Sequence, residues 1–320
     1  MPRAPTLADI TDHHARSLAL EAITLDRDNI RALPAESATG GRTPLIGHLN
    51  VVQPNRIQVL GPAEMDWWAG RDAADRRGLL RQLFTDALYG VIITDNQPVP
   101  EDLAGAARET GPPLLHSAYP CEQVISTLRH FLSRELAARV IIHGVFLDVL
   151  GTGVLLTGDP AVGKSELALE LISRGHSLVA DDAPEFSRPT PDAVYGESTP
   201  VLTDFLEVRG LGVLNIRAMY GDAAIRQRER LQLIIHLELL NEALRSQVDR
   251  LNGNLGSSDV LGLKIPSMTL PVAPGRNLAV MVEAGVRSFL LLRRGYSAAE
   301  ELMQRQNGAI ADDQARDAES

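Results

Sequence analysis

The feature that most constrains this chain is a glycine-rich octapeptide that joins a short apolar run to a helical pattern. Residues 153–157 form a β-rich run, and residues 158–165 then match the pattern G-x-x-x-x-G-K-S/T. After Ser165, apolar residues recur at helical spacing as far as Gly175, where the pattern predicts that the helix ends. A strand, a phosphate-binding loop and a helix in this order predict an α/β fold built around a nucleotide or phosphate site.

Each residue type in the loop meets a physical need of phosphate binding. Glycines let the backbone curl so that successive N–H groups point at phosphate oxygens, and the positive end of the following helix adds to the attraction. Lys164 would contact the β- and γ-phosphates of a nucleotide, and the Ser165 hydroxyl would ligate Mg²⁺. The alternative is a chance glycine-rich turn, which the coincidence of strand, octapeptide and helix disfavours. The residues predicted to bind nucleotide are Gly158, Asp159, Pro160, Ala161, Val162, Gly163, Lys164 and Ser165.

Two adjacent carboxylates follow the next apolar run along the chain. Residues 177–180 are mostly apolar and end at Asp181 and Asp182. A strand here, lying beside the strand of the loop, would put both carboxylates at the carboxyl edge of the sheet, where α/β proteins bind ligands. One can then hold a metal ion while the other accepts a proton from an attacking hydroxyl. Spacing does not rank the two, and a solvated turn before Pro184 is the alternative.

The N-terminal part of the chain alternates apolar runs with helical patterns. This alternation predicts α/β units around a mainly parallel sheet. It offers no metal-ligand spacing and no nucleophile motif, so it indicates a fold class and not a chemistry. Strands are predicted over residues 90–94 and 113–116, and helices over residues 72–88, 100–108 and 121–137.

The C-terminal end of the chain carries weaker signals. Residues 278–282 read as a strand-like apolar run. A capping-box pattern begins at Ser297 and opens a last helix, which we expect to end at Gln306 because the following residues are polar and acidic without periodicity. The predicted division is an N-terminal α/β domain over residues 1–136, a phosphate-loop domain over residues 137–310 and a disordered tail over residues 311–320.

Composition narrows the classes of function. The 31 Lys and Arg residues stand against 41 Asp and Glu, and the resulting net charge of −10 has the wrong sign for binding nucleic acid. No stretch approaches the ~18 uninterrupted apolar residues that cross a bilayer, so no membrane partner is expected. Cys121 is the single cysteine, which excludes an internal disulfide and fits a reducing, cytoplasmic compartment. Cys121 itself is interpreted as a small buried residue near a helix start.

Five blocks of sequence carry a family resemblance: IHGV at 142–145, GDPAVGKSE at 158–166, RGHSLVADD at 174–182, LEVRGLG at 206–212 and PVAPGRNLAV at 271–280. In this order they resemble the bifunctional HPr kinase/phosphorylases. The resemblance covers residues 114–294, and the N-terminal half matches only in general character. It implies an N-terminal α/β domain followed by a P-loop kinase domain of the HPr kinase/phosphoenolpyruvate carboxykinase-like type.

The resemblance also implies an activity, partners and site residues. Members use ATP and Mg²⁺ to phosphorylate a serine of the phosphocarrier protein HPr, and in reverse inorganic phosphate attacks the phosphoserine and pyrophosphate leaves. They form homo-hexamers, and their last helix contacts neighbouring subunits and HPr. Residues 206–215 would line the site in both directions, and residues 271–276 would serve mainly dephosphorylation. The implied catalytic residues are His143, Lys164, Asp182 (the acid/base) and Arg250, and the implied Mg²⁺ ligands are Ser165 and Glu207.

On the residues alone, some of these positions have plainer interpretations. A lone histidine such as His143, beside an apolar run, is more often a buried core residue. Glu207 and Arg209, two apart on a strand, share a face that is simply solvated in many proteins. If Asp182 is the base, the neighbouring charge of Asp181 would disfavour the joint ionisation of the two.

Two positions depart from the family's pattern. Pro160 and Ala161 stand where a Ser-Gly pair is usual, and alanine lacks the conformational freedom of glycine. Ala273 stands where arginine is more common, which removes a positive charge beside Arg276. Two other functions stay open: a kinase that uses the same loop on a small-molecule hydroxyl, and a non-catalytic regulatory module gated by nucleotide. A base and a second metal ligand argue against the module, because a pure sensor needs neither.

Overall fold

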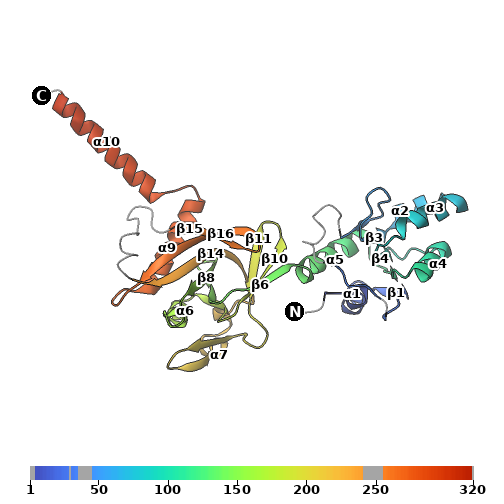
Figure 1. Ribbon diagram of the computed structural model, residues 1–320, viewed down its shortest axis with the longest axis horizontal. Helices are drawn as coiled ribbons and strands as arrows, with labels where there is room; N and C mark the ends of the chain where they lie inside the picture. The colour runs from blue at the N-terminus through green and yellow to red at the C-terminus, as the bar shows by residue number, and fades with distance from the viewer. Residues whose placement is uncertain (1–3, 29, 35–44, 241–254, 319–320) are drawn as a thin grey trace. The chain divides into compact units, whose positions relative to one another are not determined.

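The structure, a computed structural model, describes residues 4–28, 30–34, 45–240 and 255–318 (Figure 1). It divides into two compact units, Met1–Ala138 and Arg139–Ser320. The boundary predicted between residues 136 and 137 lies two positions before this division. Each unit has hydrophobic clusters made only of its own residues.

The N-terminal unit is built on a five-stranded sheet with the order β1-β5-β4-β3-β2. β2 to β5 run parallel, as the alternating pattern predicts, and β1 at the edge pairs with β5 antiparallel. Every residue of β4 is buried, because helices cover both faces of the sheet. The strands are β1 Glu21–Thr24, β2 Ile46–His48, β3 Ile57–Leu60, β4 Gly90–Ile93 and β5 Leu114–His116.

The helices of this unit divide between the two faces of its sheet. α1 and α5 bury Ile10 and Leu128 in one cluster with the sheet, and α2 to α4 bury Trp68 and Leu103 in the other. α3 ends at Leu83, short of the predicted residue 88. The helices are α1 Leu7–His14, α2 Pro62–Ala69, α3 Ala73–Leu83, α4 Glu101–Thr110 and α5 Cys121–Glu135.

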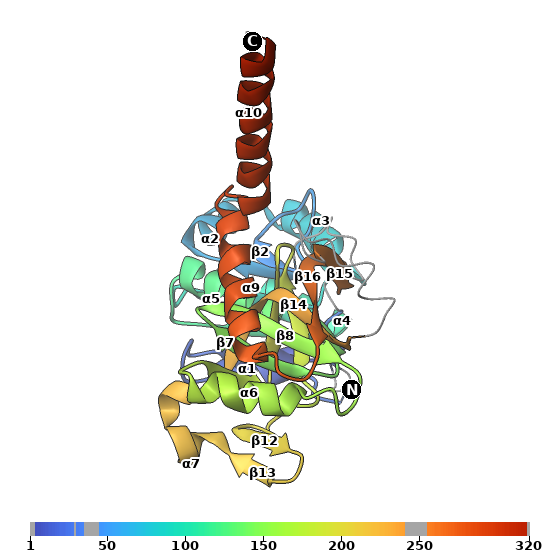
Figure 2. The same cartoon turned by 90° about the vertical axis from the view of Figure 1, so that its left-hand side faces the viewer.

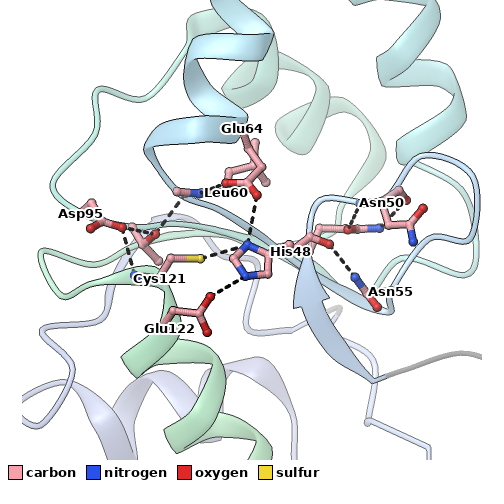
Figure 3. Close-up of polar contacts among 11 residues, drawn as sticks. His48, Asn50, Asn55, Leu60, Glu64, Asp95, Cys121 and Glu122 are labelled. Atoms are coloured by element: carbon pink, nitrogen blue, oxygen red, sulfur yellow. Dashed lines mark hydrogen bonds and ion pairs between the residues drawn. The ribbon is translucent and has the colours of Figure 1, made fainter.

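Polar side chains gather at the carboxyl edge of this sheet, where β2 ends and α2 and α5 begin (Figure 3). The His48 ring places Nδ1 3.0 Å from Glu64 Oε1 and Nε2 3.0 Å from Glu122 Oε1. Asp95 accepts a hydrogen bond from the Cys121 backbone N–H at 3.0 Å. The Cys121 thiol lies 3.6 Å from His48 Nδ1 and belongs to the apolar cluster under α5. Cys121 is therefore the small buried residue at a helix start that its sequence context predicts.

The environment of Cys121 predicts an unreactive thiol. Burial, with the nearby carboxylates of Glu64 and Asp95, raises the pKa of Cys121 to about 11. Because only the thiolate attacks, we expect iodoacetamide at about pH 8 to modify the native protein at least roughly tenfold more slowly than the denatured chain. Mass spectrometry over time measures both rates. Equal rates in the native and denatured protein would contradict the buried placement.

In its described residues, 139–240 and 255–318, the C-terminal unit is built on a nine-stranded sheet. At its centre β8, β14 and β16 run parallel, and β7 joins β8 to β9 through two antiparallel pairings. β11 pairs antiparallel with the first part of β14 and leads on to β10 and β6. The strands are β6 Ala138–Ile141, β7 Val145–Val149, β8 Thr152–Gly158, β9 Ser177–Ala180, β10 Glu185–Thr190, β11 Ala193–Glu197, β14 Arg228–Leu239, β15 Leu255–Val260 and β16 Leu263–Val272.

Two helices, α6 and α9, pack against one face of this sheet, as Figure 2 shows. Leu171 of α6 and Val286 of α9 are fully buried there beside Leu156 and Ile235 of the strands. A separate hairpin, made of β12 Phe205–Val208 and β13 Gly212–Asn215, contacts α6. The helices are α6 Lys164–Ser173, α7 Ile216–Tyr220, the short 3-10 helix η2 Asp222–Ala224, α9 Leu278–Arg293 and α10 Ala298–Ala318.

Two elements of this unit differ from the sequence prediction. β9 does not lie beside β8, because β7 and β8 form a hairpin and β7 occupies that place. Residues 278–282 are not a strand but the first turns of α9. The Asn277 side chain accepts a hydrogen bond from the Val280 N–H at 2.9 Å, and buried apolar residues then continue at helical spacing as far as Phe289.

The last helix is longer than predicted. α10 continues past Gln306 to Ala318, so the expected disordered tail over residues 311–320 is wrong as far as Ala318. Alanine, glutamine and arginine are strong helix formers and no proline interrupts them, so helical propensity continues where apolar periodicity stops. Over the described residues, no helix combines the length and apolar character needed to cross a bilayer.

An ion cluster connects α6 and α9 at the end of α6 that is farther from the loop. Arg174 donates through Nε and Nη2 to the two carboxylate oxygens of Glu283, at 2.8 and 2.6 Å. His176, a buried side chain, lies 3.0 Å from Glu283 Oε1 through its Nε2. Arg174, with His176, lowers the pKa of Glu283 to about 2.

This lowered pKa predicts how the stability of the protein depends on acid. Because the pKa falls from 4.5 to about 2 on folding, the carboxylate contributes stability above pH 4.5, and this contribution is lost as the pH falls toward 2. We expect Glu283→Gln to melt below the wild type at neutral pH, with a difference that shrinks through this acid range. Circular dichroism melting curves measure it, and a difference independent of pH would contradict the assignment.

Candidate active site

The phosphate-binding loop leaves the carboxyl end of β8 and enters α6, as the octapeptide predicts. Gly158 has a φ of 137°, and a Cβ there would lie 2.3 Å from the Leu237 carbonyl oxygen of neighbouring β14, so no side chain fits. Gly163, with a φ of 100°, caps α6 in the left-handed region. Lys164 donates from Nζ to the carbonyl oxygens of Gly158 at 2.8 Å and Asp159 at 3.0 Å, which places its ammonium group inside the curl of the loop.

Ala161 departs from the family's glycine at the point where glycine is most useful. Its φ is 65°, in the left-handed region that residues with a Cβ adopt only at a cost of about 1–2 kcal/mol. The alanine at position 161, where glycine is usual, therefore does constrain the backbone of the loop. The loop reaches its phosphate-binding shape with strain stored at this residue.

Asp182 follows β9 and, like Ala161, is a residue other than glycine with a left-handed φ, of 61°. Its carbonyl oxygen accepts a hydrogen bond from the Gly144 N–H at 3.1 Å, which ties it to the segment before β7. His143 Nδ1 lies 3.9 Å from Asp182 Oδ1, and the two side chains are 85% and 80% exposed. The interpretation of His143 as a buried core histidine is therefore wrong.

Unlike the exposed Asp182, the neighbouring Asp181 is buried and contacts β12. Its buried carboxylate accepts a hydrogen bond through Oδ2 from the Glu207 backbone N–H at 2.8 Å. Burial raises the pKa of Asp181, against the lowering effect of this bond. The structure thus separates two residues that spacing could not rank: Asp181 anchors β12, and Asp182 presents an accessible carboxylate.

One cavity of about 790 Å³ collects the predicted groups. It lies at the carboxyl edge of the sheet, between the loop, the segment before β7, the end of β9 and the β12–β13 hairpin. Glu166 also lines it, and sequence reasoning gave this residue no role because it follows the octapeptide. The lining residues are His143, Gly144, Val145, Gly158, Pro160, Ala161, Gly163, Lys164, Ser165, Glu166, Asp181, Asp182, Glu207 and Arg209.

Two further predicted contributors are Arg250 and residues 271–276. Arg250 lies outside the described residues. Residues 271–276 do not line the cavity; they end β16 and lead to the Asn277 cap of α9. Since β16, β14 and β8 are parallel neighbours, this segment ends at the same edge of the sheet as the loop, two strands away.

The oxygen donors in the cavity fit Mg²⁺. Ser165 stands in the first turn of α6, and Glu207 and Asp182 present exposed carboxylates in the same cavity. In phosphoryl-transfer sites Mg²⁺ is held by one or two carboxylates together with substrate phosphates and water. Within the described ranges, no group of three or more His, Cys, Asp or Glu residues is arranged to hold a metal ion by itself.

Two family models match the chain over nearly its whole length. The model of the HPr Serine kinase N terminus matches residues 6–132, and the model of the HPr Serine kinase C-terminal domain matches residues 134–306. The chain belongs to the HPr serine kinase family. The match to the N-terminal model extends the resemblance across the half that the sequence blocks left undetermined.

Named relatives agree with this family. An HPr kinase/phosphorylase of Chromobacterium violaceum is 46% identical over 84% of this chain and 84% of its own length. An HPr kinase/phosphorylase of Xanthomonas axonopodis pv. citri is 42% identical over 95% of this chain and 97% of its own. The solved structure of the Hpr(Ser) kinase/phosphatase from Coxiella burnetii is 30% identical and matches with a TM-score of 0.45, over 51% of this chain and 98% of that one.

The left-handed backbone of Ala161 predicts that glycine would stabilise the loop. We expect Ala161→Gly to raise the free energy of unfolding by up to about 1 kcal/mol, because relief of the left-handed strain exceeds the extra entropy of glycine in the unfolded chain. Ala106→Gly, inside α4, is the control and should lower it. Urea unfolding curves compare both variants with the wild type. A loss of stability in Ala161→Gly would show that the backbone is not strained there.

Proposed function

We propose that this protein transfers the γ-phosphoryl group of ATP to a serine of the phosphocarrier protein HPr, and removes it again by phosphorolysis. The observation that carries the proposal is a cavity that is lined both by the phosphate-binding loop and by an accessible carboxylate, that of Asp182. Membership of the HPr serine kinase family supports HPr as the partner. The relatives named HPr kinase/phosphorylase support both directions of the reaction.

In the kinase direction the loop binds and orients the phosphates of ATP. Its backbone N–H groups and the Lys164 ammonium stabilise the negative charge that spreads over the transferred group. Asp182 takes the proton from the serine hydroxyl as the serine oxygen bonds to the γ-phosphorus. The bond from that phosphorus to its bridging oxygen breaks, and ADP leaves. We assign His143, whose Nδ1 lies 3.9 Å from Asp182 Oδ1, the role of a neighbour that approaches this carboxylate during transfer.

In the reverse direction the same loop holds inorganic phosphate. A phosphate oxygen bonds to the phosphorus of phosphoserine, the bond from that phosphorus to the serine oxygen breaks, and Asp182 returns the proton to the serine. Pyrophosphate leaves. Mg²⁺, held by Ser165 and Glu207, would supply positive charge to the phosphates in both directions.

Further parts of the proposal rest on the family and not on this cavity. We assign a catalytic role to Arg250, a role in phosphorolysis to residues 271–276, and assembly as a hexamer. A chain with one cysteine suits a reducing compartment, which supports action in the cytoplasm.

The direct test mixes the purified protein with HPr and radiolabelled ATP, and then mixes it with serine-phosphorylated HPr and inorganic phosphate. We expect label on an HPr serine in the first reaction and pyrophosphate in the second. A labelled metabolite with unlabelled HPr would favour a small-molecule kinase. Nucleotide binding by calorimetry without any transfer would favour the regulatory module.

Two variants test the roles within the cavity. Asp182→Asn should lower turnover in both directions by about 10²–10⁴-fold while ATP binding persists, because asparagine tolerates the left-handed backbone but cannot take the proton. Lys164→Ala should lose nucleotide binding in calorimetry. Asp192→Asn, at the β10–β11 turn and outside the cavity, is the matched control and should behave as the wild type. Normal turnover by Asp182→Asn would remove the base assignment.

A further inference from the structure

The connection between α6 and β9 joins the two parts of the proposed mechanism. α6 begins at Lys164 and Ser165, inside the phosphate-binding loop, and β9 leads into Asp182. Only residues 174–176 lie between the helix and the strand. A shift of this short connection is therefore passed to the loop through a rigid helix of ten residues and to the carboxylate through a rigid strand of four.

Glu283 of α9 contacts both Arg174 and His176 in the connection between α6 and β9. Its carboxylate oxygens receive the paired donors of Arg174 at 2.8 and 2.6 Å, and Oε1 lies 3.0 Å from His176 Nε2. His176 is 8% exposed and Glu283 19%, whereas the Arg174 side chain is 37% exposed, so the cluster has a buried side at His176 and an open side at Arg174. Paired donors from one guanidinium restrict the orientation as well as the distance of the two groups.

α9, the helix that carries Glu283, begins close to the carboxyl edge of the sheet. α9 begins at the Asn277 cap, directly after residues 271–276, and these residues follow β16. β16 is paired with β14, and β14 with β8, which carries the loop. The loop, Asp182 and residues 271–276 thus all continue into elements that meet at Glu283.

We propose that Glu283 is a positioning residue for phosphoryl transfer, one that sets the spacing of the loop, the Asp182 carboxylate and residues 271–276 by holding the α6–β9 connection against α9. This inference rests on the proposed function, since it assigns the loop and Asp182 their roles. Glu283 is therefore expected to affect the rate of phosphoryl transfer. Reacting atoms must approach within about 3–3.5 Å, and a misplacement of ~1 Å from a distant residue costs on the order of 100-fold in rate.

The Arg174–Glu283 contact also stabilises the fold. The test must therefore separate an effect on the positions of the loop and Asp182 from an effect on the stability of the protein. Val286→Ala is the matched control: Val286 lies on the same helix, is fully buried, has an apolar side chain that cannot hydrogen-bond to the ion cluster, and does not line the cavity. Its loss of packing should lower the melting temperature at least as far as Glu283→Gln does. Both variants are compared well below their melting temperatures.

We expect Glu283→Gln to lower kcat for HPr phosphorylation and for phosphorolysis by roughly tenfold or more, with KM for ATP changed less than about twofold, because the loop still binds its ligand. Val286→Ala should keep kcat within about twofold of the wild type. Arg174→Ala, which leaves the His176 contact in place, should also lower kcat, and the double variant should lose no more than Glu283→Gln alone, because both changes break the Arg174–Glu283 contact. If Glu283→Gln does not fold, Arg174→Lys removes the paired donors and keeps the charge.

Hydrogen exchange gives a readout that does not depend on HPr. Backbone amides of residues 158–166 and 177–182 should exchange faster in Glu283→Gln than in Val286→Ala at matched stability. Wild-type kcat in Glu283→Gln, equal loss in both variants, or equal exchange in both would overturn the positioning role. A wild-type protein that fails to phosphorylate HPr would instead overturn the proposed function, and exchange would still decide the role of Glu283.

Discussion

The backbone of Gly158 passes so close to the carbonyl of Leu237 that no side chain fits between them, and the rest of the catalytic unit depends on this approach. It presses the start of the phosphate loop against β14, from where Gly163 can cap α6 in a left-handed turn. β14 in turn pairs with β16, which ends at the segment before α9. A single steric constraint therefore sets where the loop, its helix and a second edge segment lie relative to one another.

Charge in the site follows from how each side chain is buried. Asp181 faces inward and uses its carboxylate on the backbone of β12, whereas its neighbour Asp182 faces the cavity in a left-handed turn. Two adjacent acids thereby divide into one that shapes the site and one that is available for proton transfer. The cavity lining carries the cationic side chains of Lys164 and Arg209 and also four carboxylates, so the attraction for phosphate is concentrated at Lys164 and the N–H groups of the loop.

Patterns within a few neighbouring residues predicted much of this structure. The rest depends on contacts between residues that are far apart in the sequence. The strand, loop and helix of the phosphate site were readable because each follows from residues a few positions apart. The position of β9 in the sheet could not be predicted in this way, because the pairing of β7 with β8 depends on contacts across the sheet. Residues 278–282 look like a strand in a five-residue window, and only the wider apolar spacing and the Asn277 cap identify a helix. The exposure of His143 and the inward turn of Asp181 depend on neighbours far away in sequence, for which the chain carries no local signal.

The two units keep separate interiors: the clusters under the first sheet use residues up to Leu136, and those of the second begin at Val140. Every residue that lines the phosphate cavity comes after that point. A gene that lost the codons for the first unit would still encode an uninterrupted catalytic interior, so recombination at this junction could pair the kinase half with a different leading module without rebuilding its chemistry.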